Sequence, residues 1–342
     1  MGRRLSAWLN ALDLVRRLVV NGLFLLIVLL LVIAMFSKRE AVPDKAVLVL
    51  DPKGDIVEQL AVPGSGLTPI SFAEPRQTRL RDLLRAIRTA KDDARIRLMV
   101  LDLQDMGRSS LDKLQAIRQA ITDFRASGKP VVAYADHYTQ GQYYLAASAD
   151  RVFLHPMGLV GLTGFGLYRD YFKDAIDKLG INVRVFRAGK FKSAMEPFMR
   201  NDMSDADRQA NQAWMSVLWD DYKRSIGAMR GIDPAHLQAV LDDLPAHLQQ
   251  HDGSLAKLAL AEKWVDQLAD EQTVEDYVAG KLGLAAGQDI PRVRWRDYLR
   301  DTRPVEPAHS EPAVGIITAS GVIMEGDQPP GAVGASTLSA EI

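Results

Sequence analysis

Hydrophobic and polar residues follow two alternating patterns between residues 46 and 189. Short apolar runs are typical of strands buried in a parallel sheet, and apolar residues three and four positions apart indicate amphipathic helices. The predicted strands are a pair around the turn at 51–54 and single strands at 96–103, 131–135, 151–155 and 181–189. The predicted helices cover 78–92, 110–126, 140–149 and 168–180. This order predicts an α/β fold in which helices cover a parallel sheet.

A mainly helical region is predicted from Ser204 to about residue 284. Ser204 fits the cap of a long helix, with Asp207 three residues later, and Gly231 fits its end. The segment 291–299 then has the pattern of a strand followed by a helix. We therefore expect one α/β domain with a helical extension over residues 46–300.

The longest apolar run lies near the N-terminus, at 18–36. Its 19 residues carry no charge, enough for a helix to cross a hydrocarbon core of roughly 30 Å. Residues 1–17, which contain four arginines, would then form a cytoplasmic N-terminus, with the rest of the chain across the membrane. The alternative is a cleaved signal peptide, which usually has a shorter apolar region and a clearer cleavage site.

The end of the chain repeats a pattern from its beginning. The sequence AVGIITASGVIMEG at 313–326 matches AVLVLDPKGDIVEQ at 46–59 in five of fourteen positions, at a constant offset of 267 residues. Two unrelated hairpins would also look alike, but the second copy follows a proline-rich linker at 301–312. We therefore expect 313–342 to be the start of a second, truncated repeat.

Composition and charge exclude several classes of protein. The net charge of −1 gives no reason to expect binding to nucleic acid, whose partners carry clustered positive charge. The absence of cysteine excludes disulfides, thiolate catalysis and cysteine-based zinc sites. No histidine or acidic spacing indicates a metal site, and no cofactor is expected.

The segment 190–204, KFKSAMEPFMRNDMS, is the strongest candidate for chemistry. A lysine acts as a general base where desolvation or a nearby positive charge lowers its pKa, and with a serine hydroxyl it forms a Ser–Lys hydrolase. Both Lys190 and Lys192 lie beside apolar residues. Most lysines at the ends of strands are simply solvated, so the residues alone leave both readings open.

This segment, the stretch 128–156 with GKPVVAYADHYTQGQYYLAASADRVFLHP, and the N-terminal apolar run resemble the long, two-domain form of signal peptide peptidase A. The resemblance implies ClpP/crotonase-like repeated ββα units preceded by one transmembrane helix. It implies a membrane-anchored serine endopeptidase that degrades cleaved signal peptides and other apolar peptides. It also implies a homotetramer in the bacterial inner membrane, with the main domain in the periplasm.

In this family the lysine base comes from the N-terminal half and the serine nucleophile from the C-terminal half. The family motif falls on Lys192 as the base and leaves Lys190, Ser193 and Glu196 around it. Gly161 and Gly164 match the segment that lines the substrate groove. The stretch YTQGQYY at 138–144 places Gln140 where the nucleophile would stand, and DLQDMGRSS at 102–110 replaces the Gly-Gly of an oxyanion hole.

The chain is therefore expected to supply the lysine, to lack the serine, and to be inactive by itself. Thr139 and Ser193 are the alternative hydroxyls, and His137 is read as structural. Two other functions stay open: a non-catalytic scaffold or inactive fragment of the same family, and a crotonase-type acyl-CoA enzyme. An in-frame continuation with an Ala-Ser-Gly-Gly motif past the codon of Ile342 would favour the peptidase.

Overall fold

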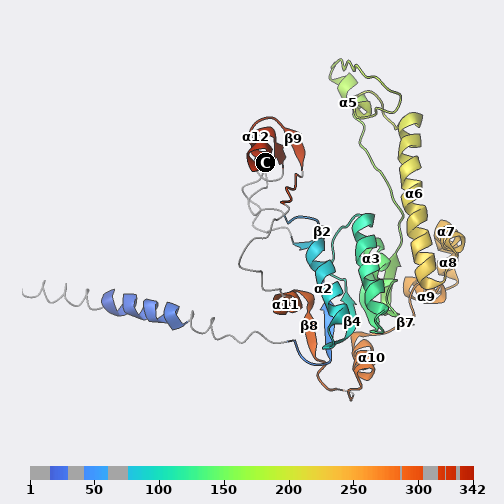
Figure 1. Ribbon diagram of the computed structural model, residues 1–342. Coiled ribbons are helices and arrows are strands. Elements are labelled where there is room, and N and C mark those ends of the chain that lie inside the picture. Colours follow the sequence, from blue (N-terminus) through green and yellow to red (C-terminus); the bar gives the residue numbers. More distant parts are fainter. Residues whose placement is uncertain are drawn as a thin grey trace, which may run out of the picture. The chain divides into compact units, whose positions relative to one another are not determined.

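The computed structural model describes residues 16–29, 42–60, 76–285, 287–302, 315–319, 321–328 and 332–342 (Figure 1). The chain divides into two compact units, Met1–Val42 and Pro43–Ile342. In the first unit, residues 16–29 are helical and exposed. Residues 30–36 of the predicted anchor, most of the N-terminus 1–17 and linker residues 303–312 lie outside the described residues. Nowhere in the described segments is a helix both long and apolar enough to cross a membrane.

A six-stranded sheet forms the centre of the second unit, with the order β7-β6-β5-β4-β1-β8. All neighbouring strands run parallel, which confirms the predicted α/β fold around a parallel sheet. The strands are β1 (Ala46–Leu50), β4 (Ile96–Asp102), β5 (Val131–Thr139), β6 (Arg151–Gly161), β7 (Gln267–Leu268) and β8 (Arg292–Arg294).

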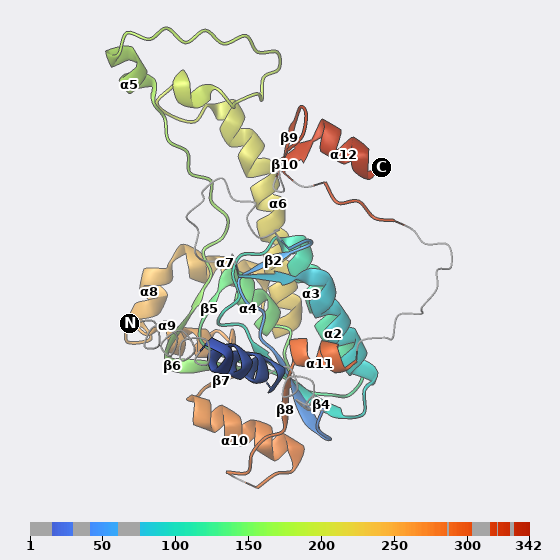
Figure 2. The ribbon, with the colours of Figure 1, turned by 90° about the vertical axis from the view of Figure 1, so that its left-hand side faces the viewer.

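Helices cover both faces of this sheet (Figures 1 and 2). Side chains of α10 (Glu271–Leu282) pack with one face of the sheet in a core of Val47, Leu98, Val132, Phe153, Ala269, Val274 and Val278. The alternate strand residues, such as Leu48 and Met99, are buried on the opposite face. There α2 (Leu80–Asp92) and α3 (Leu111–Arg125) lie side by side. Both helices agree with the predicted ranges.

Strands β5 and β6 are longer than predicted because each of them bends and then pairs again. Their register shifts between Ala135 and His137, after which His137–Thr139 pairs with Leu159–Gly161. The bend brings the two backbones close together: a Cβ added at Gly158 would lie 2.1 Å from the carbonyl oxygen of Asp136. Glycine is therefore required at position 158. The second part of each strand leads directly to the candidate site.

Shorter parallel pairs lie outside the main sheet. β2 (Asp55–Val57) pairs with β3 (Gln77–Arg79), and α2 follows β3 directly. β9 (Val322–Met324) pairs in the same way with β10 (Ala332–Gly334), and α12 (Ala335–Glu341) follows β10. β9 lies 267 residues after β2, which is the offset of the sequence repeat. Within the repeated sequence itself only β2 and β9 correspond, because residues 315–317, the counterparts of 48–50 in β1, form no strand.

The prediction for 168–189 is partly wrong. The helix covers only α5 (Lys173–Lys178), and 181–189 forms no strand. This segment lies in an arm that leaves the sheet after β6 and returns at α6 (Asp205–Arg230; Figure 1). A strand needs a hydrogen-bonded neighbour, and here side chains such as Phe186, which is 97% exposed, have no sheet beside them.

The helical region begins and ends as predicted. Ser204 caps α6 (Asp205–Arg230), and Gly231 ends it in the left-handed conformation with a φ of 67°. The next four helices are α7 (Pro234–Asp242), α8 (Leu244–Gln249), α9 (Leu255–Ala261) and α10 (Glu271–Leu282). After β8 comes α11 (Trp295–Asp301), in agreement with the predicted strand and helix at 291–299.

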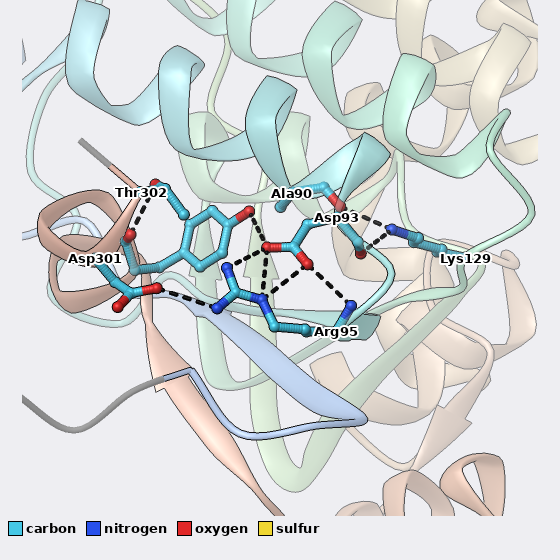
Figure 3. A network of polar contacts seen from close by, with 7 residues as sticks. Ala90, Asp93, Arg95, Lys129, Asp301 and Thr302 are labelled. Atoms are coloured by element: carbon cyan, nitrogen blue, oxygen red, sulfur yellow. Dashed lines mark hydrogen bonds and ion pairs between the residues drawn. The ribbon is translucent and has the colours of Figure 1, made fainter. Parts of the chain in front are cut away.

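A polar network joins the end of α2 to the start of β4 and to α11 (Figure 3). The carboxylate of Asp93 accepts hydrogen bonds from Arg95 Nη2 at 2.8 Å and from the Tyr298 hydroxyl at 2.9 Å. Arg95 Nη1 also donates to Asp301 at 3.2 Å. Lys129 Nζ donates to the backbone oxygens of Ala90 and Asp93, where α2 ends. The hydrogen bond from Arg95 is the main cause that lowers the pKa of Asp93 to about 2.

This network predicts a loss of stability in acid. A carboxyl group with a lowered pKa stabilises the folded state above its unfolded pKa of 3.8, and this contribution disappears as the pH falls toward about 2. The Asp93→Asn variant should therefore show a weaker decrease in unfolding free energy between pH 5 and pH 3, measured with urea. The exposed neighbour Asp92 provides the control variant, Asp92→Asn. An unchanged pH dependence in Asp93→Asn would contradict this role.

Candidate functional site

Lys192 lies in the arm, in a turn that begins at Gly189. The backbone N–H of Lys192 donates to the oxygen of Gly189 over 3.4 Å, and Gly189 has a φ of 108°, a conformation that favours glycine. The Lys192 side chain is exposed. Lys190 has a different environment, because its Nζ lies over the ring of Phe191, 5.3 Å from the centroid. The two lysines are thus held in different ways.

Glu196 is the buried acidic residue of the same segment, with only 3% of its surface exposed. Its Oε1 accepts a hydrogen bond from the Ser204 hydroxyl at 2.6 Å, and its Oε2 accepts one from the Ser204 N–H at 3.1 Å. Ser204 Oγ in turn accepts from the N–H of Asp207, as the cap of α6. The sequence motif around Lys192 is therefore attached to the first turn of a long helix.

Gln140 is the first residue of α4 (Gln140–Ala146), directly after β5. Its side-chain Oε1 accepts hydrogen bonds from the backbone N–H groups of Thr163 at 3.0 Å and Gly164 at 2.8 Å. Its Nε2 donates to the oxygen of Gly164 at 3.3 Å. The Gln140 amide thus accepts from the N–H of Gly164 and donates to its backbone oxygen, as the backbone of a neighbouring strand would. Gly164 has a φ of 71°, which explains a glycine there.

The neighbouring hydroxyl of Thr139 also takes part in a hydrogen bond within the fold. Thr139 caps α4: its Oγ1 accepts from the N–H of Gln142, and its own N–H donates to Gln142 Oε1 at 2.8 Å. Gly161, at the end of β6, pairs with Thr139 and makes only ordinary contacts. His137 is exposed on β5. The structure therefore supports a capping role for Thr139, and it places Gln140, the predicted nucleophile position, next to Gly164.

Backbone N–H groups beyond β4 are used within the fold as well. The N–H of Gly107 donates to the oxygen of Gly54 at 2.8 Å, and the N–H of Arg108 donates to Asp55 Oδ1 at 2.8 Å. These residues belong to the stretch where an oxyanion hole would be expected. Sequence reasoning missed Asp55, because nothing in the sequence indicates which N–H group this side chain reaches.

The predicted site residues therefore form two groups. One contains Gln140, Gly161 and Gly164 beside the ends of β5 and β6, and the other contains Lys192, Ser193 and Glu196 beside α6. Ser193 contributes its backbone oxygen, which accepts from the N–H of Glu196 at 2.9 Å. Among the described residues, no hydrogen bond or ion pair joins Lys192 to Gln140 or Gly164. Lys192 and Ser193 belong to no strand, and turns stand on both sides of them.

The sequence matches agree with this fold and with the resemblance. Residues 123–279 match Peptidase family S49. The chain is 37% identical over 349 residues to Protease 4 of Salmonella typhi, and 32% identical over 336 residues to Protease 4 of Haemophilus influenzae. These alignments cover 97% and 95% of this chain. These matches confirm the predicted resemblance, and residues 123–279 are similar to the serine proteases of peptidase family S49.

The matched relatives are longer than this chain. The chain spans about half the length of the curated relatives it matches, 55% and 54%. Among solved structures, a membrane-bound stomatin-specific protease, 1510-N, aligns with a TM-score of 0.38 and 15% identity, over 75% of this chain and 97% of that chain. The similarity to family S49 rests on the sequence matches.

Proposed function

We propose that the chain is the lysine-bearing half of a membrane-anchored Ser–Lys endopeptidase that degrades cleaved signal peptides. In this proposal Lys192 is the general base, and the serine nucleophile lies outside these 342 residues. The proposed protein is a single-pass protein of the bacterial inner membrane, with its main domain in the periplasm. It forms a homotetramer, and its ββα units resemble those of ClpP and crotonase.

The observation that carries the proposal is the position of Gln140. It begins the helix after β5, where the family places its nucleophile, and its amide is bound to Thr163 and Gly164. An amide cannot attack an acyl carbon. The nearby N–H groups of Gly107 and Arg108 already donate within the fold, so they are not free to bind an oxyanion. These contacts support a nucleophile from another part of the protein.

The proposed reaction is an acyl transfer. Lys192 Nζ takes the proton from a serine hydroxyl as the serine oxygen bonds to the peptide carbon, and the ammonium then returns the proton to the leaving amine. Water hydrolyses the acyl-enzyme by the same proton transfers. An apolar peptide would bind as an added strand beside the segment with Gly161 and Gly164.

A non-catalytic scaffold is the second candidate function. The same internal contacts of Gln140, Gly107 and Arg108 favour it, because they describe a half-site without free catalytic groups. In that case the chain would bind or present peptides, or assemble with active subunits, without hydrolysis.

The proposal predicts that the purified 342-residue chain does not hydrolyse a fluorogenic apolar peptide, whereas a longer protein that contains it and an Ala-Ser-Gly-Gly motif does. Both proteins are assayed at equal concentration in detergent, and circular dichroism confirms that the shorter chain is folded. Hydrolysis by the 342-residue chain would contradict a nucleophile outside it. No hydrolysis by the longer protein would favour the scaffold.

A further inference from the structure

Arg187 contacts both Lys192 and Glu196 in the arm. Its Nη1 donates a hydrogen bond of 2.9 Å to the backbone oxygen of Lys192. The same nitrogen lies 3.6 Å from Oε1 of Glu196, close enough for an ion pair. The Arg187 side chain is 44% exposed, whereas the Glu196 side chain is only 4% exposed. Arg187 therefore connects a buried negative charge to the backbone of the candidate base.

At the Glu196 end, hydrogen bonds to the start of α6 hold the carboxylate in place. Both carboxylate oxygens of Glu196 accept hydrogen bonds from Ser204, which caps α6, a helix of 26 residues. A buried carboxylate is costly unless several donors and a positive charge satisfy it, and here Ser204 and Arg187 do so. Glu196 thus fixes the guanidinium relative to the N-terminus of α6.

At the Lys192 end, the other backbone hydrogen bond is weaker. The N–H of Lys192 reaches Gly189 only over 3.4 Å, at the long limit for a hydrogen bond. The 2.9 Å bond from Arg187 is the shorter of the two hydrogen bonds described for the Lys192 backbone. An arginine suits this place because its planar guanidinium presents several donors, so it can serve a carbonyl and a carboxylate together.

We propose that Arg187 and Glu196 are positioning residues for Lys192. Glu196 holds Arg187 at the start of α6, and Arg187 holds the carbonyl of Lys192, which sets where the lysine side chain begins. Neither residue exchanges a proton with substrate. This inference rests on the proposed function, in which Lys192 is the base.

The test compares four variants of the longer, active protein: Arg187→Ala, Arg187→Lys, Arg184→Ala and Lys192→Ala. Arg184 is the matched control, since it lies exposed in the same segment and makes no hydrogen bond or ion pair among the described residues. Misplacing a catalytic group by about 1 Å can cost up to roughly 100-fold in rate. Arg187→Ala should therefore lower kcat about 10-fold or more with KM nearly unchanged, and Arg187→Lys should restore part of this loss.

Thermal unfolding of each variant separates positioning from folding. A midpoint close to that of the unchanged protein, together with the loss in kcat, supports the proposal. If Arg187→Ala does not fold, Arg187→Gln keeps an amide donor to Lys192 without the charge and should show the same loss of kcat in weaker form. Unchanged kcat in the folded Arg187 variants, or an equal loss in Arg184→Ala, would overturn the inference.

The result for Lys192→Ala distinguishes a failure of the positioning role from a failure of the proposed function. If Lys192→Ala is inactive while the Arg187 variants behave as the unchanged protein, the positioning role fails and the proposed function stands. If Lys192→Ala keeps its activity, the proposed function itself fails.

Discussion

The Lys192→Ala variant of the longer protein should lose about 10²–10⁴-fold in kcat, the range that a positioned general base contributes. Alanine cannot accept the proton of the serine hydroxyl, so the nucleophile would remain a neutral alcohol. KM should change little, because in this account Lys192 acts on the serine and does not bind the peptide. Hydrolysis of a fluorogenic apolar peptide gives both constants.

Lys190→Ala is the matched comparison for this prediction. Its Nζ lies over the ring of Phe191, so removal of this side chain changes the local charge without removing the proposed base. We expect a much smaller loss of kcat than in Lys192→Ala. A larger loss in Lys190→Ala than in Lys192→Ala would show that Lys190, and not Lys192, is the base.

The Phe153→Ala variant should reduce the free energy of unfolding by about 3–5 kcal/mol, the usual cost of removing a large aromatic side chain from a core. Phe153 is fully buried in the core beside α10, and its ring meets that of Tyr277 edge-on at a centroid distance of 5.2 Å. Its removal leaves a cavity between the sheet and α10. Denaturation with urea at 25 °C measures the change.

Phe186→Ala is the control for the core prediction. Phe186 has the same side chain but is 97% exposed in the arm. Its replacement should change the unfolding free energy by less than about 0.5 kcal/mol, as for most surface substitutions. Equal effects of the two replacements would show that the contact between the sheet and α10 does not carry the stability assigned to it.

The elements of the sheet could be predicted because their patterns are local. The apolar run of β4 and the helical spacing of α2 each agree with the structure within a few residues. The same method failed at 181–189, where the residues favour a strand but the fold provides no neighbouring strand. The bend of β5 was also missed, since it depends on the close approach of Asp136 and Gly158.

For the candidate site, too, the sequence predicts some features and not others. The family resemblance predicts a site motif around Lys192 and puts Gln140 at the nucleophile position, and both stay predictions. The bonds of Gln140 to Gly164, and those of Arg187 to Lys192, could not be predicted from the sequence. They join residues 24 and five positions apart through loop geometry, which no periodic pattern encodes.

The most direct test of the central claim is labelling of the longer protein with a fluorophosphonate probe, which reacts with an activated serine. Mass spectrometry of the labelled peptides locates the nucleophile. The account predicts a single labelled serine outside residues 1–342, and very slow labelling of the same serine in Lys192→Ala. A label on Thr139 or Ser193, or equal labelling rates with and without Lys192, would contradict it.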